Sequence, residues 1–72
     1  MTKKLNPIAL FVKEKRKKLN LTQIQLAEKA GVGVRFIREL EQGKETLQLN
    51  KVNQVLKLFG HEVGPIKKIV ED

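Results

Sequence analysis

Apolar residues recur at helical spacing in four segments of the chain, and short polar stretches separate these segments. The segments run from about residue 7 to 18, 22 to 30, 34 to 42 and 50 to 60. The residues expected to face inward are Ile8, Phe11, Val12, Leu19, Ile24, Ala27, Ala30, Phe36, Ile37, Leu40, Val52, Val55, Leu56 and Phe59. Leu26 is expected beside the apolar face of the second segment. The pattern therefore predicts four amphipathic helices around one small core.

Capping residues and glycines mark where these helices begin and end. Three polar residues suited to an N-terminal cap precede the first, second and fourth segments, namely Asn6, Thr22 and Asn50. Three glycines suited to a C-terminal stop follow the second, third and fourth segments, namely Gly31, Gly43 and Gly60. Residues 44–49 are expected to be extended, with Leu47 and Leu49 as apolar anchors.

The second and third segments are joined by only Gly31-Val32-Gly33, and two short helices joined by a tight turn with glycine are typical of a helix-turn-helix. The third helix is expected to expose Val34, Arg35, Arg38 and Glu39. Arg can donate two bonds to guanine, Glu can accept from cytosine, and Val can contact a thymine methyl group. The same pattern also fits the solvated face of an ordinary helical bundle.

Composition narrows the class of partner. The 72 residues include 15 basic and 8 acidic side chains, a formal charge of +7, which favours nucleic acid as a ligand. Three Phe and no Trp or Tyr disfavour readers of single strands, which stack bases on aromatic rings, so duplex DNA is expected. The chain contains no Cys and no apolar run long enough for a signal or a membrane span. We expect a single-domain, soluble, cytoplasmic protein.

The run Leu21 to Val32, followed by Ile37 and by Glu41-Gln42-Gly43-Lys44, resembles the Cro/C1-type (Xre) helix-turn-helix family. The resemblance covers about residues 8 to 60. It implies an all-α fold, a compact four- to five-helix lambda-repressor-like DNA-binding domain in residues 1–60. Residues 61–72 are expected to form a short C-terminal tail or edge strand, because Pro65 cannot donate to a strand ladder.

The resemblance also implies roles for individual side chains. The positions that usually reach DNA bases are occupied here by Gly33, Val34, Arg35, Arg38 and Glu39. Phosphate contacts are expected from Thr22, at the start of the second helix, and from Gln23 and Lys44. Arg16 and Glu41 match a pair that often clasps the first helix to the third, and the alternative is two unrelated surface charges. Gly33 and Val34 can supply few hydrogen bonds, so Arg35 and Arg38 are the better candidates for base recognition.

Residues 34–44 and 49–60 are similar to one branch of this family, the HipB-like antitoxins. That similarity implies a homodimer that represses its own operon at a palindromic operator and binds a kinase-like HipA-type toxin. The protein would then be cytoplasmic and associated with the nucleoid when bound to DNA. The dimer contact is expected from the tail, through Val63, Ile66 and Ile69.

Two other functions stay open from the sequence. A free-standing or phage-type Xre repressor would have the same domain without a toxin partner. A protein-interaction adaptor would keep the fold without base recognition, and Gly33 and Val34 favour that alternative.

No enzyme is expected, because no His, Ser or carboxylate arrangement suggests catalysis. No cofactor or metal is expected either, since His61 is the single histidine and has no cysteine or carboxylate cluster.

Overall fold

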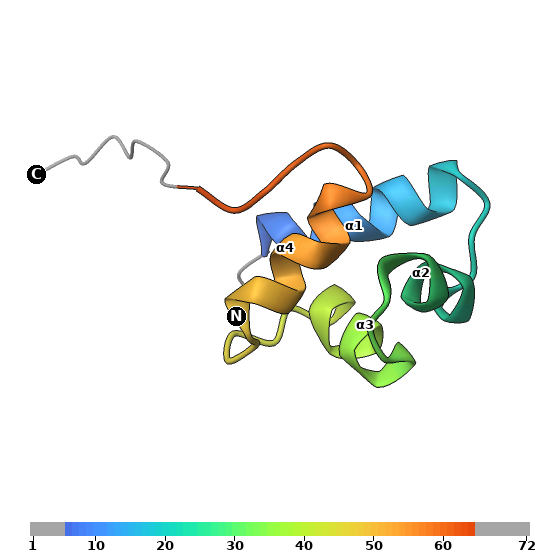
Figure 1. Cartoon of the computed structure of the whole chain (residues 1–72). Coiled ribbons are helices and arrows are strands. Elements are labelled where there is room, and N and C mark those ends of the chain that lie inside the picture. The colour runs from blue at the N-terminus through green and yellow to red at the C-terminus, as the bar shows by residue number, and fades with distance from the viewer. Residues whose placement is uncertain (1–5, 65–72) are drawn as a thin grey trace, which may run out of the picture.

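The computed structural model describes residues 6–64, in which four helices are joined by short turns (Figure 1). Their bounds are Pro7–Lys18 for α1, Gln23–Ala30 for α2, Val34–Glu41 for α3 and Leu49–Lys57 for α4. α3 packs against both α1 and α2, and α4 packs against α2. The all-α fold expected from the sequence is confirmed. None of the helices in residues 6–64 has the length and apolarity needed to cross a membrane.

The core takes one completely buried side chain from each helix: Val12, Leu26, Ile37 and Val55, all with 0% of their surface exposed. Burying a side chain of this size contributes about 1.5–3 kcal/mol. Smaller or less central core residues surround them, namely Ala27, Ala30, Leu40, Val52 and Leu56. Since a domain this short has room for only one core, the four helices depend on each other.

The predicted caps of α1 and α2 are confirmed. The Asn6 side chain accepts hydrogen bonds from the backbone N–H groups of Ile8 (2.9 Å) and Ala9 (3.2 Å). Thr22 forms a reciprocal capping box with Gln25: the Gln25 N–H donates to Thr22 Oγ1 at 3.0 Å, and the Thr22 N–H donates to Gln25 Oε1 at 2.9 Å. These bonds satisfy N–H groups that the first turn of a helix leaves free.

Two of the residues expected to face inward are exposed. Ile24 has 59% of its surface exposed, whereas Leu26 is fully buried. At about 100° per residue, Leu26 lies almost opposite Ile24 on α2, so both cannot face the core. Leu19 is 56% exposed because α1 ends at Lys18, and the chain turns away at Asn20, which has a positive φ of 59°.

The start of α4 and the tail also differ from expectation. α4 begins at Leu49, so Asn50 lies inside the helix, and the N-cap is Gln48, which makes no side-chain capping bond. Leu49 is exposed, whereas Leu47 packs against the core as expected. Residues 61–64 form no strand. Pro65, Ile66 and Ile69, on which the tail prediction rests, lie outside the described residues.

Candidate nucleic-acid interface

The turn between α2 and α3 is held from both sides. Gly31 adopts the left-handed conformation (φ 75°), and its N–H donates to the Ala27 carbonyl at 2.9 Å, which ends α2. Gln54 of α4 donates through Nε2 to the carbonyl oxygens of Ala30 (2.9 Å) and Gly31 (3.1 Å). The sequence carries no local signal for this role of Gln54, because its partners lie more than twenty residues away. The angle between the two helices is therefore braced by α4.

α3 turns Ile37 and Leu40 into the core, and its remaining residues differ in exposure. Arg38 is exposed, and the Arg35 side chain is 88% exposed. Val34 is only partly exposed and packs against the core, so it was wrong to expect it fully outward. Gly33 is open, with no atom within 4 Å of the position a Cβ would take. The two arginines are thus the long donor side chains on the outer face of α3.

Glu39 lies next to two of the predicted DNA-contacting cations. Its Oε2 is 3.6 Å from Arg35 Nε and 3.4 Å from Lys44 Nζ. The Lys44 N–H also donates to the Glu39 carbonyl oxygen at 3.1 Å, which places Lys44 directly beyond the end of α3. Arg38 takes part in no ion pair among residues 6–64.

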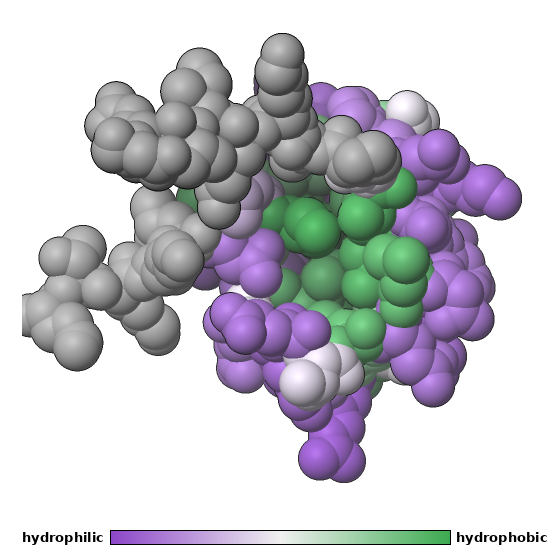
Figure 2. All heavy atoms as spheres, turned by 90° about the vertical axis from the view of Figure 1, so that its left-hand side faces the viewer, coloured by the Kyte–Doolittle hydropathy of each residue, from purple (hydrophilic) through white to green (hydrophobic). Residues whose placement is uncertain are grey.

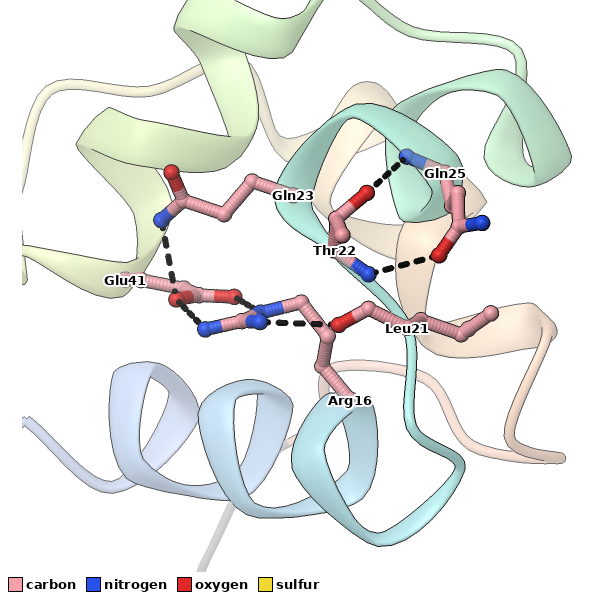
Figure 3. A network of polar contacts seen from close by, with 6 residues as sticks. All are labelled: Arg16, Leu21, Thr22, Gln23, Gln25 and Glu41. Atoms are coloured by element: carbon pink, nitrogen blue, oxygen red, sulfur yellow. Dashed lines mark hydrogen bonds and ion pairs between the residues drawn. The ribbon is translucent and has the colours of Figure 1, made fainter.

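The predicted pair of Arg16 and Glu41 forms and is the centre of a polar network between three helices (Figure 3). Arg16 donates from Nε to Glu41 Oε2 at 2.7 Å and from Nη2 to Glu41 Oε1 at 3.0 Å. Its third bond, from Nη1, reaches the Leu21 carbonyl at 2.9 Å. The hydrogen bond to Glu41 raises the pKa of Arg16, an effect that partial burial opposes. The Glu41 side chain is only 2% exposed, so this ion pair is screened little by solvent.

Both predicted phosphate-contacting residues of α2's first turn have partners within the chain. Gln23 Nε2 donates to Glu41 Oε1 at 3.1 Å, and Thr22 Oγ1 accepts from the Gln25 N–H. An amide nitrogen carries two hydrogens, so Gln23 keeps one for a second acceptor. The network thereby fixes where Gln23 lies relative to α3. Whether these residues contact phosphate stays a prediction.

The fold and this outer face define a class, that of helix-turn-helix DNA-binding domains, which place the second helix of the motif in the major groove. Residues 12–62 match the model of the helix-turn-helix family HTH_3, and the chain belongs to this family, as its Cro/C1-type pattern predicted. It is also similar to a protein of Sinorhizobium fredii (strain NBRC 101917 / NGR234) with the name "Uncharacterized HTH-type transcriptional regulator y4mF". The two are 53% identical over 53 residues, which cover 74% of this chain and 70% of that protein. The chain is a DNA-binding regulator of the helix-turn-helix class.

Proposed function

We propose that the protein is cytoplasmic and represses transcription by binding a palindromic operator as a homodimer, with α3 of each copy in the major groove. The observation that carries the proposal is the division of α3 into an inner side, with Ile37 and Leu40, and an outer side, with Arg35 and Arg38. A recognition helix needs one side packed firmly against its own domain and long hydrogen-bond donors on the opposite, exposed side. In such dimers, the centres of the two half-sites lie about 34–36 Å apart.

The residues divide between base recognition and phosphate contact. Arg35 and Arg38 would donate to guanine edges, while Lys44 and Gln23 would bind phosphates and fix the register. Gly33, Val34 and Glu39 would complete the base-facing set, and Thr22 would add a contact at the start of α2. Gly33 and Val34 contribute contact area but little hydrogen bonding.

Homodimerisation is proposed through the side of the molecule that Figure 2 shows, where apolar residues gather inside a hydrophilic rim. A hollow of about 470 Å³ on the described chain is lined by Pro7, Ile8, Phe11, Leu56 and Val63, among others. The described chain ends at Gly64, which also lines this hollow, and the apolar residues Ile66 and Ile69 follow. We expect this segment of one copy to pack against the hollow of the other. Val63→Glu should then shift the protein from dimer to monomer in analytical ultracentrifugation.

Base recognition is tested by selecting duplexes from a random pool and then comparing two variants on the selected site. Arg38→Ala should cost about 1–3 kcal/mol on that site and relax the preference at the base pair it contacts. Lys44→Ala should weaken binding to all duplexes nearly equally and reduce the salt dependence by about one unit of slope. If both variants bind the selected site like the parent, α3 does not dock as proposed.

We further propose that the operator lies upstream of the protein's own gene and that the protein is the antitoxin of a HipB-like toxin–antitoxin pair. The similarity of residues 34–44 and 49–60 to HipB-like antitoxins supports this role. Co-expression with a kinase-like product of a neighbouring gene should then yield a stable complex and relieve toxicity. If no such neighbour exists, the protein is a free-standing or phage-type repressor instead.

A second candidate function is that of a protein-interaction adaptor. The half-buried Val34 and the exposed Gly33 favour it, because neither side chain can form a hydrogen bond at a position expected to contact bases. A gel shift with the DNA upstream of the gene, at moderate salt, separates the two functions. A sequence-selective shift supports the repressor, and its absence supports the adaptor.

A further inference from the structure

Glu39 is a single carboxylate that two cations of the proposed DNA-binding face share. Arg35 and Lys44 both approach the same oxygen, Oε2, at 3.6 and 3.4 Å. Glu39 itself keeps 26% of its side chain exposed, and it lies beside Arg35 and Lys44 of the proposed DNA-binding face. The local charge of this trio is therefore +1 and not the +2 that the two cations alone would present to phosphates.

These contacts do little for the stability of the fold. Exposed ion pairs contribute little, because water and salt screen them. Arg35 precedes Glu39 by four residues, the less favourable order for an acid–base pair on a helix. Glu39 also lies in the last turn of α3, where a negative charge opposes the helix dipole. Removing its charge should therefore leave the domain folded.

We propose that Glu39 is a specificity-determining residue that lowers the affinity for unrelated DNA more than the affinity for the operator. This inference rests on the proposed docking of α3 in the major groove. Binding to unrelated DNA comes almost entirely from cation–phosphate contacts, so pairing Arg35 and Lys44 with a carboxylate weakens it directly. The carboxylate also repels any phosphate that approaches Lys44.

The operator restores the binding free energy that the weakened cation–phosphate contacts remove. Once displaced from Glu39, Arg35 can donate two bonds to a guanine edge, and the free carboxylate can accept from a cytosine amino group. An unrelated sequence offers no such set of partners, so the ion pairs are broken without replacement. Repulsive elements of this kind raise specificity by penalising wrong partners.

The test compares Glu39→Gln with Glu14→Gln in the full chain. Both variants remove one negative charge from a residue on a helix surface, but Glu14 is exposed on α1 and forms no ion pair within residues 6–64. Fluorescence anisotropy titrations with the selected duplex and with an unrelated duplex of equal length, over a series of salt concentrations, give the affinities and salt slopes.

We expect Glu39→Gln to raise the affinity for the unrelated duplex by about three- to tenfold and to steepen its salt slope by up to about 0.9. The affinity for the selected duplex should rise less or fall. The ratio of the affinity for the selected duplex to that for the unrelated duplex should therefore decrease. Glu14→Gln should change both affinities by a similar, smaller factor. In a Lys44→Gln background the effect of Glu39→Gln should shrink, because one of its two partners is gone.

The outcomes separate this inference from the proposed function. If the parent prefers the selected duplex but Glu39→Gln changes both affinities no more than Glu14→Gln does, Glu39 does not determine specificity, and the proposed function stands. If the parent itself binds no duplex selectively, the proposed function is wrong and the inference falls with it.

Discussion

Replacing Arg16 with Met would leave the buried carboxylate of Glu41 with one hydrogen-bond partner among the contacts described, the amide of Gln23. Met retains an apolar stem of similar length, so the change removes mainly the guanidinium and its three hydrogen bonds. Leaving a buried charge without its partner costs about 3–5 kcal/mol. A domain of 72 residues has roughly 4–11 kcal/mol of stability in total, at about 0.05–0.15 kcal/mol per residue.

Arg16→Met should therefore lower the free energy of unfolding by about a quarter or more, or prevent folding. The measurement is urea and thermal denaturation followed by far-ultraviolet circular dichroism, since the chain contains no Trp or Tyr for fluorescence. Each kcal/mol lost corresponds to a fall of about 4–8 °C in Tm for a domain of this size. The double variant Arg16→Met with Glu41→Leu removes both charges and should recover most of the loss.

A loss below about 1 kcal/mol for Arg16→Met, the value typical of exposed ion pairs, would mean that the pair of Arg16 and Glu41 behaves as a solvated one. A double variant no more stable than the single one would mean that the unpaired carboxylate of Glu41 is not the source of the loss. The pH dependence of the stability difference between the parent and Arg16→Met is a further check. The hydrogen bond to Glu41 raises the pKa of Arg16, so the contribution of this group is fully present at neutral pH, far below its ordinary pKa, and is lost only as the pH rises through the raised pKa. The difference between parent and variant should thus stay constant between about pH 7 and 9.

Three further predictions concern the helices and the turn. Leu26→Ala should cost about 2–5 kcal/mol of stability, whereas Ile24→Ala on the same helix should cost less than about 0.5. Gly31→Ala, at a φ of 75°, should cost about 1–2 kcal/mol, whereas Gly33→Ser should change stability by a few tenths, because serine is a good N-cap. Thr22→Ala should cost about 1 kcal/mol through loss of the capping box. Denaturation curves measure all three.

The caps of α1 and α2 and the turn could be predicted from the sequence because each depends on neighbours in the chain, whereas the cap predicted for α4, Asn50, lies inside that helix. Asn6 and Thr22 accept hydrogen bonds from N–H groups two or three residues away, and Gly31 takes a positive φ that glycine adopts without steric cost. Ile24 was misplaced because α2 is only eight residues long. In so short a helix, two apolar arcs fit the spacing about equally well, and only the packing against α3 and α4 chooses between them.

The candidate site was predicted less completely, because its contacts join distant parts of the chain. Arg16 and Glu41 could be paired only through the family resemblance. Gln54, which braces the turn, carries no local signal of its role. The pairing of Glu39 with Lys44 likewise depends on how the chain leaves α3 after Gly43. Side chains that act across helices become visible only when the helices are placed.

The meeting of one buried side chain from each helix has a consequence for how new DNA targets could arise. Leu26 and Ile37 lie in one buried cluster with Val12 of α1 and Val55 of α4, so an excised α2–α3 fragment would expose them and collapse or aggregate instead of reading DNA. Conversely, Arg35 and Arg38 can be exchanged without disturbing that shared centre. A lineage could redirect the protein to another operator by substitutions at these outward sites while its melting behaviour stays almost unchanged.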